Sequence, residues 1–153
     1  MTNEKGFAKI LVPLDGSKNA DRALTKAIFI AEKFQSELIL VHIIDEYFID
    51  FTTDMEGYQI PNSTSIKIKK ASMENAKGML KKRHEKVQKR KINCKYEVIV
   101  GDVSEKIINY SKENSIDLIV IGARGLGKFK QLLLGSISNK VSIGSGCPVM
   151  IVK

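Results

Sequence analysis

The chain has 153 residues, of which 43% are hydrophobic and 27% are charged. This length fits one domain over residues 1–153, and the composition is that of a globular protein rather than a disordered or fibrous one. No apolar run approaches the ~18 residues that a membrane span needs, and the N-terminus lacks the apolar core of a signal peptide. We therefore expect a cytoplasmic protein without a membrane partner.

The net charge of +8 is concentrated in one segment. Residues 67–91 contain eleven basic and two acidic side chains, so this segment carries +9 and the remainder of the chain carries −1. Clustered basic residues can bind nucleic acid, but this segment has no aromatic residue, and charge runs on helices are usually solvated. The preceding acidic stretch, residues 45–56, could neutralise part of the charge. A nucleic-acid partner is not expected.

The first part of the chain predicts a strand, a helix and a second strand. Residues 8–14 and 37–44 are apolar almost throughout, which is typical of strands covered on both faces. Ser17 is placed to cap a helix that runs to about residue 34. The apolar face of that helix consists of Ala20, Ala23, Leu24, Ala27, Ile28 and Ala31. Two strands joined by a helix indicate a right-handed parallel crossover.

Residues 45–65 contain turn-forming residues and read as a long loop, and a helix is expected over residues 66–91. Its apolar stripe consists of Met73, Ala76, Leu80 and Val87. The start is ambiguous because residues 66–69 alternate as a strand would. His84 falls on the stripe, and we expect it to be a packed side chain rather than a metal ligand.

Three more strands are expected at residues 94–100, 118–121 and 148–152, separated by helices that begin after Asp102 and after Gly135. The alternation indicates a five-stranded parallel sheet with helices on both faces. In the doubly wound order 3-2-1-4-5, the first and fourth strands meet at a switch point, where ligands bind. Asp15 and Gly122 end these two strands and should therefore border one pocket. Cys94 and Cys147 should lie at opposite edges, too far apart for a disulfide.

A glycine-rich stretch follows the fourth strand. Gly122, Gly125 and Gly127 would allow left-handed backbone conformations and a close approach of N–H groups to an anion. Gly135 and Ser136 open a helix whose N-terminus favours negative charge. Two interpretations of this stretch are possible: a phosphate-binding site, or an ordinary turn between a strand and a helix. The pattern is not a Walker loop, because G-x-x-x-x-G-K-[ST] is absent.

The spacing G-x-x-G-x9-G-S at Gly122, Gly125, Gly135 and Ser136 resembles the ATP-binding signature of the universal stress protein family. The segments Val12-Pro-Leu-Asp-Gly-Ser17, Leu38–His42 and Cys147–Val152 are also similar to that family, so the resemblance covers nearly the whole chain. It implies an α/β doubly wound fold, flavodoxin-like and similar to the adenine nucleotide alpha hydrolases.

The resemblance also implies a ligand, a site and an assembly. ATP with Mg²⁺ is the expected cofactor, and the last strand would pair with its copy to form a homodimer. Backbone groups of the glycine segments and two serine hydroxyls would hold the triphosphate, while Asp15 and the Val41 backbone would lie toward the adenine and ribose. The implied binding residues are Pro13, Leu14, Asp15, Val41, Gly122, Arg124, Gly125, Gly127, Gly135, Ser136, Ile137 and Ser138. Asp15 and Ser136 have a structural alternative as helix caps.

No catalytic set of residues is apparent, and Asp15 is the only acid expected near the ligand. The function that the resemblance implies is a nucleotide-responsive binding or signalling module of the stress response, with a slow ATP hydrolase or adenylyl-transfer enzyme as the alternative. A phosphoacceptor receiver domain is disfavoured, because the third strand ends in Val100 and Gly101 rather than in an aspartate.

Overall fold

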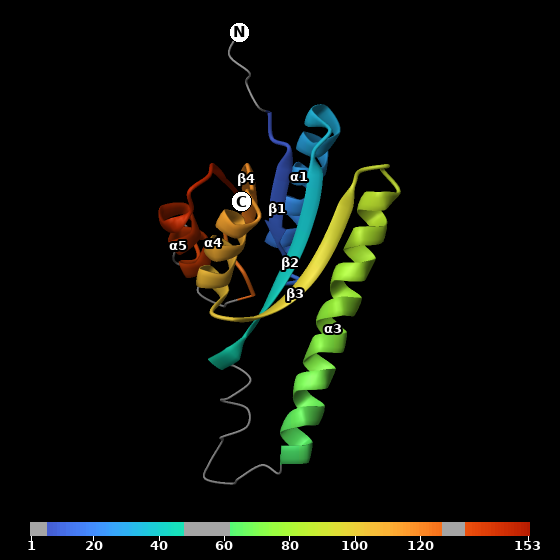
Figure 1. Cartoon of the computed structure of the whole chain (residues 1–153), viewed down its shortest axis with the longest axis vertical. Coiled ribbons are helices and arrows are strands. Elements are labelled where there is room, and N and C mark those ends of the chain that lie inside the picture. Colours follow the sequence, from blue (N-terminus) through green and yellow to red (C-terminus); the bar gives the residue numbers. More distant parts are fainter. Residues whose placement is uncertain (1–5, 48–61, 127–133) are drawn as a thin grey trace.

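The computed structural model describes residues 6–47, 62–126 and 134–153. Its centre is a parallel sheet in the order β3-β2-β1-β4-β5 (Figure 1). The strands are β1 (Lys9–Pro13), β2 (Glu37–Asp45), β3 (Cys94–Gly101), β4 (Leu118–Gly122) and β5 (Val149–Val152). The predicted doubly wound sheet and its strand order are confirmed.

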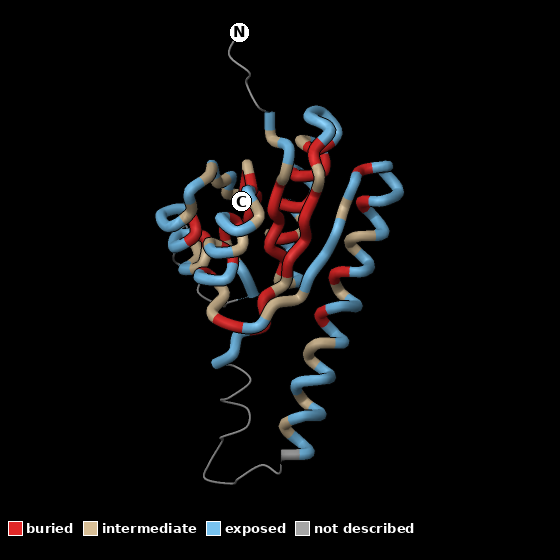
Figure 2. Tube along the Cα trace, viewed as in Figure 1, coloured by how far each residue is buried: buried red, intermediate tan, exposed pale blue. Residues whose placement is uncertain are grey.

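Helices cover both faces of this sheet. They are α1 (Lys18–Phe34), α3 (Asn62–Gln88), α4 (Val103–Glu113) and α5 (Ser136–Gly144). One apolar layer joins alternate residues of the central strands, such as Ile10 and Leu38, to α1 and α3, and the other joins Leu11 and Ile39 to α4 and α5. The three central strands, β1, β2 and β4, have a helix layer on each side and bury most of their residues, which explains their continuous apolar sequence (Figure 2). The edge strands β3 and β5 are more exposed.

Side-chain caps determine where two helices begin. The Ser17 hydroxyl accepts a hydrogen bond from the Ala20 N–H at 3.1 Å, as predicted. The Asp102 carboxylate accepts one from the Glu105 N–H at 2.9 Å. That bond, with a further one from the Ser104 hydroxyl, lowers the pKa of Asp102 below its usual value. Both caps lie directly after a strand, so each helix starts at the same end of the sheet.

The long helix α3 differs from the prediction at both ends. It begins at Asn62 and ends at Gln88, while Lys91 adopts a left-handed φ of 57°. Because β2 also extends through Asp45, the loop predicted for residues 45–65 is too long, and residues 48–61 lie outside the described residues. The alternation at residues 66–69 was misleading. The C-terminal half of α3 packs on the sheet through Ala76, Leu80 and Val87. Once this half is helical, adding further turns is favourable, so the helix continues beyond the sheet as an exposed N-terminal extension (Figure 2).

The isolated histidine and cysteines behave as packed side chains. His84 Nε2 lies 2.8 Å from the Cys94 carbonyl oxygen, and its ring centroid lies 5.0 Å from that of Tyr96. Cys94 and Cys147 are free thiols at opposite edges of the sheet, as predicted. Burial raises the pKa of Cys94 to about 12, so its thiol stays protonated at neutral pH. Within the described ranges, no helix is both long and apolar enough to cross a membrane.

Candidate functional site

A cavity of about 880 Å³ lies beyond the carboxyl ends of β1 and β4, a volume typical of small-molecule sites. Its walls come from the ends of β1, β2 and β4 and from the first turns of α1, α4 and α5. Asp15 and Gly122, far apart in the sequence, both line it. This is the switch point of the strand order, and the predicted convergence of these two residues is confirmed.

Most of the predicted binding residues line this cavity. They are Pro13, Leu14, Asp15, Gly122, Arg124, Gly125, Gly135, Ser136, Ile137 and Ser138. Gly127 lies outside the described residues. Val41 does not line the cavity, because it is fully buried and its carbonyl accepts a hydrogen bond from the Leu14 N–H at 2.8 Å. That these residues bind a nucleotide remains a prediction.

The described glycines of the loop are required by close packing rather than by left-handed backbone. Gly122, Gly125 and Gly135 all have φ outside the left-handed region, so the left-handed conformation expected at Gly122 and Gly125 is wrong. A Cβ on Gly122 would lie 2.8 Å from the backbone carbon of Asn19, where α1 crosses the end of β4. A Cβ on Gly125 would lie 2.5 Å from Asp15 Oδ2. At Gly122 the backbone of α1 excludes a side chain, whereas at Gly125 the Asp15 carboxylate would have to move.

Asp15 is held by the turn that leads into α1. Its Oδ1 accepts a hydrogen bond from the Ser17 N–H at 2.9 Å, while Ser17 itself caps the helix. The alternative in which Asp15 caps α1 is therefore wrong. One carboxylate oxygen orders the turn, and the other lies next to Gly125 across the cavity.

The start of α5 has no side-chain cap. Its N-cap is Gly135, which makes no side-chain capping bond, and Ser136 is the first helical residue, so the alternative of Ser136 as a cap is also wrong. An uncapped helix start leaves backbone N–H donors and a partial positive charge available to an anion. Because Gly135 and Ser136 line the cavity, this helix start borders the same space as Asp15.

Ser138 ties the end of β4 to α5. The residue is 2% exposed, and its hydroxyl oxygen lies 2.9 Å from the Ala123 carbonyl oxygen and 3.0 Å from that of Gly135. The Gly135 N–H also donates to the Ala123 carbonyl, at 2.6 Å. These bonds bring the two glycine segments together.

Ser138→Ala should therefore lower the free energy of unfolding by about 1 kcal/mol, because both carbonyls keep a backbone partner while one buried hydrogen bond is lost. Ser142→Ala is the matched control on α5, since its exposed hydroxyl bonds only the Asn139 carbonyl, at 2.7 Å. Urea denaturation of both variants measures the difference. Equal stability losses would contradict a linking role for Ser138.

The cavity also contains two polar residues that the sequence analysis missed, His42 and Asp45 on β2. The expectation that Asp15 is the only nearby acid is therefore wrong. His42 Nδ1 lies 2.7 Å from the Leu14 carbonyl oxygen, so Nδ1 carries the proton, because a carbonyl can only accept. Their place follows from the register of the sheet, in which Pro13 pairs with Val41, so that residues just after Val41 flank the end of β1.

The family model described as the Universal stress protein family matches residues 6–153. This chain belongs to the universal stress protein family. It is 32% identical over 148 residues to universal stress protein YxiE of Bacillus subtilis, covering 96% of this chain and 99% of that protein. The solved structure of MJ0577, a universal stress protein of Methanocaldococcus jannaschii, has a TM-score of 0.84 at 28% identity, covering 97% of this chain and 96% of that one.

Universal stress proteins of the same fold have been solved with nucleotides. One in complex with cAMP has a TM-score of 0.67 at 21% identity and covers 97% of this chain and 98% of its own. One from Archaeoglobus fulgidus in complex with dAMP has a TM-score of 0.60 at 20% identity and covers 97% of this chain and 99% of its own. At these identities the likeness establishes the fold.

Proposed function

We propose that this universal stress protein binds ATP with Mg²⁺ in the cavity between β1 and β4, and acts as a cytoplasmic, single-domain, nucleotide-responsive module of the stress response. The observation that carries the proposal is the uncapped start of α5 at Gly135, which borders the switch-point cavity together with Gly125 and Asp15. Such a helix start suits a phosphate group.

The lining of the cavity fits the parts of an adenine nucleotide. Half-buried Arg124 and the α5 N-terminus supply positive charge for phosphates. A Cβ at Gly135 would lie 3.4 Å from the Arg124 Cα, and a Cβ at Gly125 would lie 2.5 Å from Asp15 Oδ2. Ile43, Ile107 and Ile121 provide apolar wall for the base. The solved cAMP and dAMP complexes of two other universal stress proteins support the proposal, because the same fold accommodates adenine nucleotides there.

Magnesium is expected to arrive with the nucleotide. Within the described ranges there is no group of three or more His, Cys, Asp or Glu residues that could hold a metal ion. Mg²⁺ bound to a nucleotide needs only one or two carboxylates, because phosphate oxygens and water supply its other ligands. Asp15 and Asp45 are the carboxylates that line the cavity.

Turnover is expected to be secondary to binding. A general base must lie within hydrogen-bond reach of the proton it removes. The Asp15 carboxylate orders the turn before α1 through the Ser17 N–H, and its other oxygen, next to Gly125, is a proposed ligand of the magnesium ion. His42 Nδ1 already bonds the Leu14 carbonyl, so neither side chain is a free base held against an attacking water. Single-turnover analysis with ATP distinguishes the binding module from the alternative, a slow ATP hydrolase or adenylyl-transfer enzyme.

Calorimetry and analysis of bound nucleotide test the proposal directly. The supernatant released by heating the purified protein should contain adenine nucleotide, and nucleotide-free protein titrated with ATP and Mg²⁺ should bind about one ATP per chain. If the nucleotide-free protein gives no binding heat and no thermal stabilisation with ATP, the proposal fails.

We also propose that the protein forms a homodimer through β5, which lies at a sheet edge with Met150 39% exposed. An apolar edge strand invites pairing, and a lysine on it opposes pairing. Met150→Lys should shift the light-scattering mass at micromolar concentration from dimer to monomer. Val100→Lys, on the opposite edge strand β3 and 40% exposed, is the matched control and should leave the dimer intact. A monomeric parent protein would contradict the proposal.

A further inference from the structure

The basic charge of α3 is not used by the nucleotide cavity. Two arginines in and near α3 form ion pairs with α1. Arg83 pairs with Asp21, and Arg90, which lies just beyond the end of α3, pairs with Glu32. Neither partner belongs to the acidic stretch at residues 45–56, most of which lies outside the described residues. The lysines of α3 have no ion-pair partner in the described part of the chain.

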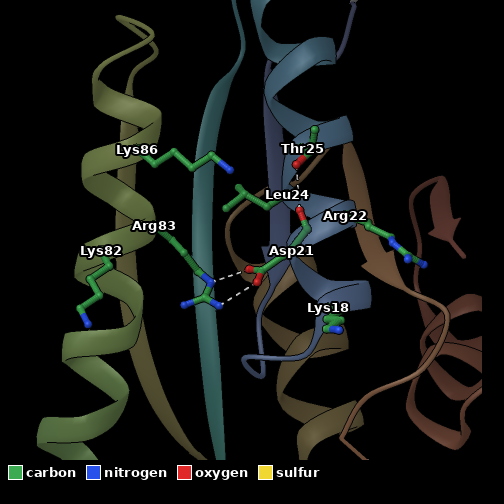
Figure 3. A pocket seen from close by; sticks show the side chains of 8 residues that line it. All are labelled: Lys18, Asp21, Arg22, Leu24, Thr25, Lys82, Arg83 and Lys86. Carbon is green, nitrogen blue, oxygen red and sulfur yellow. Dashed lines mark hydrogen bonds and ion pairs between the residues drawn. The ribbon is translucent and has the colours of Figure 1, made fainter.

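Some of these lysines border a second cavity, of about 480 Å³, between α1 and α3 (Figure 3). Its lining consists of Lys18, Asp21, Arg22, Leu24, Thr25, Lys82, Arg83 and Lys86. We call this the α1–α3 groove. It is separate from the nucleotide cavity, because the two share no lining residue, although the first turn of α1 borders both.

An ion pair links the two walls of the groove. Arg83 Nε lies 2.7 Å from Asp21 Oδ1 and Nη2 lies 3.1 Å from Oδ2, while Nη1 donates to the Met79 carbonyl at 3.2 Å (Figure 3). The Arg83 side chain is only 18% exposed. A bidentate pair of this kind fixes geometry as well as charge. It holds α3 against α1 and engages Asp21, the one carboxylate among the lining residues that the structure describes.

The other basic groups of the groove are left uncompensated. Lys18 and Arg22 on α1, and Lys82 and Lys86 on α3, are each four residues apart and so follow one another along a helix face. Lys86 reaches from α3 toward Leu24, whereas Arg22 extends away from α3 at the rim (Figure 3). With one acid among five basic residues, the lining carries a formal +4. A bound anion would offset this local excess of positive charge.

The side chains that line the groove favour a small phosphate compound over a peptide or a nucleic acid. Leu24, the one apolar residue in the described lining, is 1% exposed, so this lining offers no apolar anchor for a peptide. The described lining also has no aromatic ring on which a base could stack, as single-stranded nucleic acid requires. Duplex DNA is read by elements that enter its grooves, whereas these cations lie along the two walls of a groove. Flexible ammonium groups around a small hollow suit a compact, highly charged phosphate compound.

We propose that the α1–α3 groove binds a small oligophosphate anion, as a site separate from the nucleotide cavity. The proposal does not depend on the proposed function, because no residue of the nucleotide cavity takes part.

The test titrates inorganic tripolyphosphate into the full-length protein at physiological ionic strength, with amide chemical shifts recorded to locate the binding. The largest shift changes should fall on α1 near Asp21 and Thr25 and on α3 from Lys82 to Lys86. Lys82→Gln with Lys86→Gln should weaken this binding about ten-fold. Lys81→Gln with Lys89→Gln is the matched control, since it removes the same charge from exposed residues outside the groove, and it should change the affinity less than about two-fold.

Each other outcome overturns the proposal. Equal losses in the two double variants would mean general charge attraction. Shift changes confined to residues 122–138 would place the anion in the nucleotide cavity, which would favour the proposed function while excluding the groove. Tighter binding of a DNA duplex or of a poly-glutamate peptide, lost in the Lys82 and Lys86 variant, would make the groove a docking site for a macromolecule instead.

Discussion

Gly125→Val and Gly135→Val should each weaken ATP binding by about ten-fold or more, because overpacking of a closely packed site forces its neighbours to move. A Cβ on Gly125 would lie 2.5 Å from Asp15 Oδ2, and one on Gly135 would lie 3.0 Å from the Ala123 carbonyl oxygen. Displacing Asp15 or the Ala123 carbonyl would change the distance between the two walls of the cavity. The bound nucleotide must contact both walls at once. Calorimetry with ATP, alongside thermal melting without nucleotide, measures binding and folding separately.

Two further variants give a smaller expected loss of ATP affinity and a control without loss. Ser136→Ala removes one hydroxyl at the start of α5 and should weaken binding by about 1–2 kcal/mol. Gly146→Val, at a glycine with no atom within 4 Å of a built Cβ, should leave ATP affinity unchanged. Since neither Gly125 nor Gly135 has a left-handed φ, valine adds no backbone strain of that kind. If the folded variants bind ATP as tightly as the parent, the loop is only a turn and the ligand is unknown.

Gly122→Ala should destabilise the fold itself, by about 1–3 kcal/mol. The added Cβ would lie 2.8 Å from the Asn19 carbonyl carbon and 2.9 Å from the Ala20 nitrogen. These are backbone atoms in the first turn of α1, which cannot rotate away as a side chain can. The helix would have to shift from the end of β4.

The midpoint and slope of urea unfolding measure this effect. Gly78→Ala is the control within α3, where a built Cβ meets nothing within 4 Å, and it should raise stability by about 0.5–1 kcal/mol through helix propensity. A Gly122→Ala protein that unfolds at the same urea concentration as the parent would contradict the close packing of α1 on β4.

The sequence by itself determined the features that depend on interactions between residues close in the chain. Ser17 and Asp102 cap helices through bonds to residues three positions away, so the caps can be recognised without knowing the fold. Continuous apolar runs indicated strands buried on both faces, and their alternation with helices indicated a parallel sheet. From that sheet, the meeting of Asp15 and Gly122 at one cavity followed.

The tertiary structure decided what depends on packing between distant segments. His42 and Asp45 join the cavity, and Val41 does not, because the register of β2 against β1 determines which residues extend past the sheet. Gly122 is glycine because α1 crosses it, a contact with residues about one hundred positions earlier that no local pattern records. Arg83 of α3 likewise pairs with Asp21 on α1 rather than with the acidic stretch that precedes α3, since helix packing rather than sequence proximity determines which charges meet.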